Sequence, residues 1–304
     1  MIESAFPFLR QVKVTIGPYN DLTTQNLDDK LALVFKGDGT QDFFRIKFSI
    51  HKHKMTTATP TVVQLYNLKT ETRSILANSR NKSITIEAGW INTKLYTLFN
   101  GSVTTSFSRR QGSDIVTDVM SLASSAAIGR SVVSKTWGAN TELKNVIMDL
   151  AKQLPGVTVS PKFINVKNSK FGKQGITLAG SVSDSLDRLA RTYGFSWHVN
   201  EKKFIAVDDK DFISAYDTPI LSTENGYLMR CEPMLATPWQ NQIGTTIKSI
   251  LHPSIQPSGS VIIDSKINPK LSGKYTVHTL NHVGDTHSSE WHSNIESWIQ
   301  VAAG

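Results

Sequence analysis

The sequence predicts a mainly β protein with an α/β insert, and three observations support this prediction. Short runs of alternating apolar and polar residues fill the first and last thirds of the 304-residue chain. The middle third instead carries two apolar patterns with the period of amphipathic helices. Glycine and proline turn signals separate these segments. The predicted order is therefore β-rich, α/β and β-rich, in a chain long enough for about two domains.

The clearest strand in the first third starts at Phe44, where apolar and polar residues alternate as far as His51. This period of two predicts a half-buried antiparallel strand with an outward row that is basic. One short helix is expected over Glu71–Ala77, capped by Thr70. Further strands are expected at Arg10–Ile16, Leu31–Lys36, Val62–Leu68, Ser83–Ala88 and Leu95–Phe107, with turns at Gly17-Pro18, Gly37-Asp38-Gly39 and Asn100-Gly101.

The middle third predicts two helices followed by a hairpin. The first helix runs from Leu143 to Leu154, is capped by Asn140 or Thr141, and ends at Pro155-Gly156. The second is capped by Ser183, buries one apolar face and ends at Gly194, which suits a left-handed C′ position. The hairpin joins Phe195–Val199 to Phe204–Val207. In the last third, strands are expected at Gly244–Leu251, Ser260–Asp264, Gly273–Val283 and Glu290–Val301.

Composition excludes several classes of protein. A hydrophobic content of 39% and a charged content of 19% are those of a folded chain, not of a disordered one. No apolar run is long enough for a membrane-spanning helix, and the N-terminus lacks the features of a secretory signal. The single cysteine, Cys231, excludes an intrachain disulfide and a cysteine-built metal site. We therefore expect a soluble chain made in a reducing compartment.

The positive charge is concentrated in the first third. The net charge is +8, and residues 1–110 hold 15 Lys and Arg against 8 Asp and Glu. Such a surface suits an acidic protein partner or nucleic acid, although a solvated sheet face explains it equally well. The candidate interaction residues are Arg45, Lys47, Lys52 and Lys54. If they dock a neighbour, reversing two of them weakens assembly in a salt-sensitive way while folding survives.

Three ordered sets of motifs resemble the baseplate hub proteins of contractile-tailed phages. The hub halves of type VI secretion and contractile bacteriocin spikes are similar, and the sequence alone does not separate these systems. The resemblance covers roughly residues 10–300. The sets are Val63–Leu68 with Ile84–Trp90 and Leu98–Val103; Leu186–Trp197; and Gly273–Val277 leading to His282–Thr286 and Glu290-Trp291.

The resemblance implies two tail-tube-like antiparallel β-barrels and a small α/β domain. The corresponding division is residues 1–108 for the first barrel, 109–222 for the α/β region and 223–304 for the second barrel. The middle region can also lend strands around Asp114–Ser121 and Val132–Trp137 to the second barrel. Three chains would form a ring with six barrels, a homotrimer that adapts a sixfold tail tube to a threefold central spike.

The same resemblance implies a structural role in the virion. Expected partners are the tail tube protein, the spike protein and baseplate wedge or neighbouring tail proteins. DNA would pass only transiently through an axial channel during genome ejection. Assembly would take place in the host cytoplasm, and the tail would be contractile. No cofactor, metal or catalytic residue is implied.

The residues that could carry chemistry have sufficient structural explanations. On a strand, His278 and His282 would lie about 13 Å apart, too far for joint metal ligation without a partner strand. His287 and His292 complete a cluster of four histidines, but those in the loop could converge only through folding that the sequence does not show. The carboxylates of Asp208, Asp209 and Asp211 belong to a polar turn, whereas Asp184 and Asp187 begin a helix. Cys231 lacks an adjacent histidine motif and is expected to be a buried thiol. An enzymatic function is therefore not expected.

Nucleic-acid binding is the main alternative function. Basic strands with interleaved aromatic residues resemble single-strand-binding surfaces in composition. However, Phe44 and Phe48 share the apolar row of their strand, which makes them core residues and leaves only Phe43 for stacking. Salt-dependent binding to a labelled oligonucleotide would separate the two functions.

Overall fold

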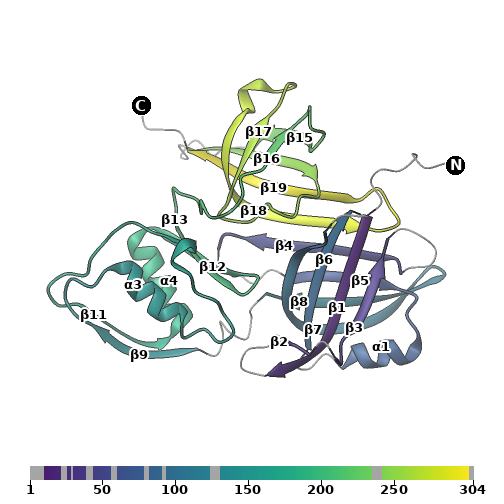
Figure 1. Ribbon diagram of the computed structural model, residues 1–304, viewed down its shortest axis with the longest axis horizontal. Helices are drawn as coiled ribbons and strands as arrows, with labels where there is room; N and C mark the ends of the chain where they lie inside the picture. The colour runs from purple at the N-terminus through teal and green to yellow at the C-terminus, as the bar shows by residue number, and fades with distance from the viewer. Residues whose placement is uncertain are drawn as a thin grey trace.

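The computed structural model describes residues 10–21, 26–28, 30–38, 44–55, 60–78, 82–90, 94–123, 131–234 and 242–300. It confirms a mainly β protein with an α/β insert. Figure 1 shows the N-terminal strands at the lower right, the α/β part at the left and the C-terminal strands above. No helix among these residues is long and apolar enough to cross a bilayer. Phe43 lies outside the described residues.

Seven strands of the first part form an antiparallel sheet in the order β3-β1-β6-β7-β8-β5-β4. The backbone amide of Phe44 donates to the carbonyl of Lys36, which brings the two ends of this run together. Alternate residues point inward to one apolar core, including Ile46, Phe48 and Ile50. The elements are β1 (Arg10–Asp21), β2 (Asn26–Leu27), β3 (Leu33–Gly37), β4 (Ile46–His53), β5 (Pro60–Tyr66), α1 (Thr70–Ala77), β6 (Lys82–Trp90), β7 (Tyr96–Gln111) and β8 (Asp114–Leu122).

The α/β part has its own apolar core beneath two helices. The buried face of α3 and that of α4 both pack into this core. β12 and β13 form a hairpin whose turn residues, Glu201 and Lys202, both have positive φ, as a two-residue type I′ connection requires. The elements are β9 (Val132–Trp137), α3 (Leu143–Ala151), a 3₁₀ turn (Pro161–Phe163), β10 (Ile164–Asn165), β11 (Ile176–Ser181), α4 (Val182–Tyr193), β12 (Phe195–Asn200) and β13 (Lys203–Asp208).

The C-terminal strands follow the order β15-β16-β19-β18-β17-β14 around a third core. β14 pairs with β17 in parallel, so this unit is not purely antiparallel. The elements are β14 (Ile220–Ser222), β15 (Leu228–Pro233), β16 (Gln242–Ile250), β17 (Ser260–Asp264), a 3₁₀ turn (Pro269–Leu271), β18 (Gly273–Asp285) and β19 (Trp291–Gln300).

The two β-rich parts share one hydrogen-bonded sheet. β18 belongs to the C-terminal unit, and its second half pairs antiparallel with β4 from Thr279 to Asp285. Figure 1 shows these two strands side by side between the parts. The junction is therefore built into the backbone ladder and does not depend on side-chain contact alone.

Two expected turns are instead strand interiors. Asn100-Gly101 lies within β7, where Asn100 is paired with Thr85 and Gly101 with Ile84. A Cβ on Gly101 would come within 2.6 Å of the Leu122 carbonyl oxygen, so the glycine permits a close approach of strands and does not make a turn. Gly17-Pro18 likewise lies inside β1, opposite β6. Pairing with a neighbouring strand outweighs the local turn preference in both places.

The middle strands and the helix caps also differ from expectation. β8 pairs with β5 and β7 of the first sheet, and β9 pairs with β11, so neither is lent to the C-terminal unit. Ser181, not Ser183, caps α4, since its side chain accepts a hydrogen bond from the amide of Asp184. Glu142 takes the N-cap position of α3 and Lys69 that of α1, without side-chain capping bonds.

Candidate functional site

The candidate interaction residues lie at the junction between the three parts. Arg45 precedes β4, and its guanidinium forms a salt bridge with Asp285 (Nη2–Oδ2 2.8 Å) at the end of β18. It also lies 4.6 Å from the ring centre of Tyr66. Burial alone would raise the pKa of the Asp285 carboxyl, but hydrogen bonds from Arg45 and the His287 backbone outweigh it and hold the pKa below its usual value. Arg45 therefore stabilises the β4–β18 contact.

Lys47 forms a more exposed contact of the same kind. Its Nζ lies 2.7 Å from Oε2 of Glu290, just before β19. Both side chains keep more than a third of their surface accessible, so solvent screens the pair. Arg45 and Lys47 are thus the two members of the basic set that retain accessible surface, although each already has an acidic partner in the same chain.

Lys52 and Lys54 are buried, although docking a neighbour would require them to be exposed. β4 continues to His53, so its even-numbered residues remain on the inward face after the apolar run ends. This end of the strand lies next to the β12–β13 hairpin. Lys52 Nζ lies 3.0 Å from Oε1 of Glu201 and 2.9 Å from Oε1 of Gln256. The charge that the sequence assigns to the surface instead occupies an internal junction.

Lys54 is the most enclosed of the four, at 1% exposure. Its ammonium donates to the backbone carbonyls of Asp208 and Asp209 at 3.4 and 3.3 Å. Burial lowers its pKa, against the opposing influence of the nearby Asp209 and Asp208 carboxylates. The backbone amide of Lys54 also donates to the carbonyl of His278 on β18. This one residue therefore contacts both the α/β hairpin and the C-terminal sheet.

The sequence did not predict the side chains that accept hydrogen bonds or form salt bridges at the junction. Glu201, Gln256, Asp285 and Glu290 lie roughly 150–240 positions from the basic residues that they contact. Pairing over such distances leaves no periodic signal in a single sequence. Together, these side chains link the three parts of the chain through hydrogen bonds and salt bridges. Their arrangement is not typical of a catalytic site.

Histidines are spread across this region and are not gathered. His282 is fully buried in β18, and its Nδ1 lies 2.8 Å from the Ser293 hydroxyl. His287 shares a hydrogen bond with Thr286, and His292 lies on β19. Burial lowers the pKa of His278 to about 4, with Lys54 adding to the effect. Within the described residues, no group of three or more His, Cys, Asp or Glu side chains could hold a metal ion.

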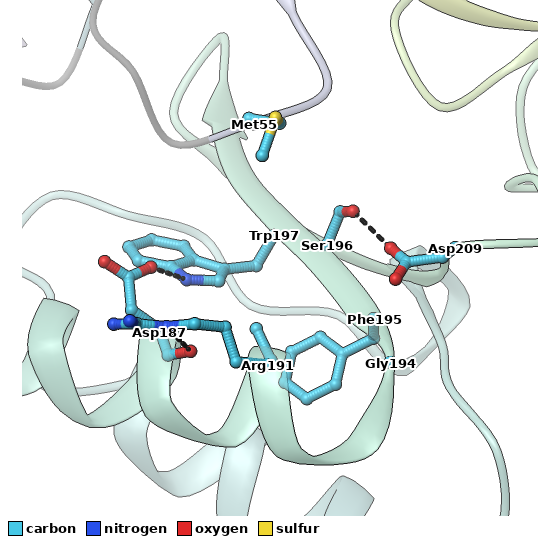
Figure 2. A pocket seen from close by; sticks show the side chains of 9 residues that line it. Met55, Asp187, Arg191, Gly194, Phe195, Ser196, Trp197 and Asp209 are labelled. Atoms are coloured by element: carbon cyan, nitrogen blue, oxygen red, sulfur yellow. Dashed lines mark hydrogen bonds between the residues drawn. The ribbon is translucent and has the colours of Figure 1, made fainter. Parts of the chain in front are cut away.

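Two of the carboxylates considered for a catalytic pair, Asp187 and Asp209, line a pocket of about 420 Å³ between α4, β12 and Met55 (Figure 2). Asp187 accepts a hydrogen bond from the indole of Trp197 at 2.8 Å, and Asp209 accepts one from Ser196 at 2.6 Å. Each carboxylate thus orients a neighbouring side chain of the hairpin. Asp184 lies in the first turn of α4, whereas Asp211 accepts from Asn165.

Cys231 is a buried free thiol on β15. Burial raises its pKa to about 11, so the thiol stays protonated and unreactive near neutral pH.

Removing the charge of Lys52 should destabilise the fold far more than removing that of Lys47. We expect Lys52→Met to lower the free energy of unfolding by about 2 kcal/mol, because Glu201 and Gln256 lose their shared donor. Lys47→Met, which breaks the exposed pair, should cost less than about 1 kcal/mol. Urea unfolding measures both. Equal losses in the two variants would contradict the stabilising role of the Lys52 contacts at the junction.

The fold is shared with tail and secretion proteins. A tail protein from Neisseria meningitidis MC58 has a TM-score of 0.60 at 7% identity, with coverage of 95% of this chain and 97% of the other. A 43 kDa tail protein of prophage MuSo2 from Shewanella oneidensis has a TM-score of 0.60 at 8% identity, covering 94% and 96%. The E. coli c3393 protein, a type VI secretion component described as similar to the phage T4 tail proteins gp27 and gp5, scores 0.58 at 11% identity, covering 85% and 74%.

A comparison with curated protein sequences found no match. The family model described as baseplate hub gp41 matches residues 26–295. This range includes β4, the α/β part and most of the C-terminal strands, and so the whole junction. Because the match spans most of the sequence, the chain belongs to the baseplate hub gp41 family.

Proposed function

We propose that the protein is a homotrimeric adaptor that joins a sixfold tail tube to a threefold central spike around an axial channel. The observation that carries this proposal is the continuous sheet through β4 and β18, which joins two β-rich units in one chain by backbone pairing. A threefold ring can meet a sixfold tube only if each subunit presents two similar faces. The two units would supply those faces, and the proposed role is structural, with no catalysis.

The proposed domain division follows the strand pairing. The first barrel-like unit extends beyond residue 108, because β7 and β8 complete its sheet. The α/β part begins with β9, and the C-terminal unit begins with β14. With this division, each of the three parts has one apolar cluster as its main core.

The proposed setting is the baseplate of a contractile phage tail, assembled in the host cytoplasm. Partners would be the tube protein, the spike, and wedge or neighbouring tail proteins, with DNA passing transiently during ejection. The accessible parts of Arg45 and Lys47 would face one of these neighbours. Lys47→Met tests this role, since its small expected cost in stability leaves assembly as the measured change.

The oligomeric state tests the adaptor directly. We expect light scattering to show three copies of the 33.6 kDa chain, either in the protein alone or only once the spike protein is added, in which case the mass of the bound spike adds to that of the trimer. Averaged particle images should show six barrel-like densities around a central channel. A protein that stays monomeric with the spike added contradicts the adaptor. Tight oligonucleotide binding that persists near physiological salt would instead favour the nucleic-acid alternative.

A further inference from the structure

A cavity of about 390 Å³ lies where the first sheet meets the C-terminal strands. Its size is within the range typical of sites that bind a ligand or a side chain. Among the described residues its wall holds one carboxylate, that of Asp217, and no Lys or Arg. The aromatic wall residues are Trp90, Tyr96, Tyr227, His252 and Trp291.

The Asp217 carboxylate is an unpaired negative charge in this wall. The residue is exposed, just before β14, and no Lys or Arg within the described ranges forms a salt bridge with it. Its charge reaches the His252 ring, since it raises the pKa of that histidine against the larger lowering effect of burial. Because the net effect lowers the pKa, His252 stays neutral near pH 7 and does not neutralise the carboxylate.

The aromatic side chains of the wall form two contacting pairs. The ring centres of Trp90 and Trp291 lie 5.8 Å apart, and those of Tyr227 and His252 lie 5.1 Å apart. The faces of Trp and Tyr rings attract ammonium and guanidinium groups, most strongly where water is excluded. A carboxylate beside such rings adds a second attraction of the same sign, so the wall suits a cation.

Two cations outside the wall restrict where a bound cation can lie. Arg10 lies 5.5 Å from the ring centre of Trp291, and its guanidinium donates to backbone carbonyls at the β18–β19 turn. Lys94 lies 6.0 Å from the ring centre of Tyr96. Both would repel a further positive charge from these two rings. The most favourable position for a bound cation is therefore beside the Asp217 carboxylate.

Arginine fits this combination of groups better than lysine. Its planar guanidinium stacks on aromatic rings and donates two parallel hydrogen bonds to a carboxylate, whereas an ammonium acts as a point charge. We propose that the cavity binds an arginine side chain of a partner protein, with the guanidinium paired to Asp217 beside Tyr227 and His252. An exposed ion pair alone contributes little because solvent screens it, but the aromatic wall shelters this one. The proposal does not depend on the oligomeric state of the chain.

Titration of the full-length protein with an arginine peptide tests this proposal. The probe is N-acetyl-Gly-Arg-Gly-amide, and the matched peptide carries citrulline, which keeps the shape of arginine but not its charge. Indole N–H signals of ¹⁵N-tryptophan-labelled protein report binding, and Trp90→Phe identifies the signal from the cavity wall. Asp217→Asn removes the wall carboxylate. Asp264→Asn is the control variant, because Asp264 is exposed on β17 and lies outside the wall.

We expect the arginine peptide to shift the Trp90 signal and to bind about fivefold or more tightly than the citrulline peptide. Asp217→Asn should weaken arginine binding by a similar factor, whereas Asp264→Asn should change it less than about twofold. Near-ultraviolet circular dichroism confirms that both variants are folded. Equal affinities for the two peptides overturn the proposal and would assign the cavity to a neutral group. An arginine affinity that Asp217→Asn leaves unchanged also overturns it, as does a Trp90 signal that millimolar peptide does not shift.

Discussion

Acidification from pH 7.5 to 5 should lower the free energy of unfolding by about 4 kcal/mol through two junction histidines alone. His198, on β12, is buried, and burial followed by the charge of Lys54 lowers its pKa to about 3. His278, on β18, has a pKa lowered to about 4 by the same two causes. In the unfolded chain both would titrate near 6.5. Below that pH the unfolded state binds protons that the folded state does not, at about 1.4 kcal/mol per histidine and pH unit.

The direction of this pH effect follows from the histidines, which stay neutral in the folded state but become protonated in the unfolded state. The stabilising contribution of each histidine is complete above pH 6.5 and is lost as the pH falls toward its folded pKa, between 6.5 and about 3 for His198. His198→Phe removes one titrating group, so we expect the difference in unfolding free energy between pH 7.5 and 5 to shrink by about 2 kcal/mol. His51→Gln, which changes an exposed histidine on β4, is the control variant. Urea midpoints at the two pH values decide between these outcomes.

The acid effect has a structural consequence at the junction. Lys52 of β4 and Lys54, just after this strand, already place positive charge near His198. Protonating His198 or His278 would add like charge where three parts of the chain meet. We expect the contacts between the parts to open before the individual cores, and hydrogen exchange at pH 5 would show this as early loss of protection in β4 and β18.

Local patterns predicted those parts of the fold in which neighbouring residues decide the structure. The alternation from Phe44 correctly placed Ile46, Phe48 and Ile50 in the core, but Phe44 itself, which was expected there too, is 40% exposed. The strand expected at Ser260–Asp264 has the bounds of β17. The same alternation could not show that the chain continues as β4 under a distant hairpin. The burial of Lys52 and Lys54 therefore depends on tertiary contacts that have no local signature.

Turn signals failed for a related reason. Asn100-Gly101 has the composition of a hairpin turn, yet the ladder between β6 and β7 holds it extended. Strand pairing contributes several backbone hydrogen bonds on both sides of the dipeptide, whereas the turn preference is confined to two residues. The candidate site was predictable only as a set of basic residues, because its acidic partners come from elements far along the sequence.

Gly284→Ala should be the most damaging single methyl addition at the β4–β18 contact. A Cβ at this position would lie 2.4 Å from Cζ of Phe48 and 3.0 Å from Cε3 of Trp291. Phe48 is fully buried and packs edge-to-face on Trp291, so its ring has little room to move. Overpacking a site of this kind costs about 1–3 kcal/mol, and occasionally more. We expect a loss near the upper end in urea unfolding.

Two further variants distinguish overpacking from a general intolerance of alanine. Gly138→Ala meets nothing within 4 Å and should change stability by less than about 0.5 kcal/mol. Phe48→Leu removes the ring that the new methyl would strike, so adding Gly284→Ala to Phe48→Leu should cost clearly less than adding it to the native chain. Purely additive losses would show that the glycine matters for another reason, such as backbone freedom. A strong coupling would instead locate the damage at the β4–β18 pairing, which joins the two β-rich units. Hub assembly should fail in that variant, while α3 and α4 keep their hydrogen-exchange protection.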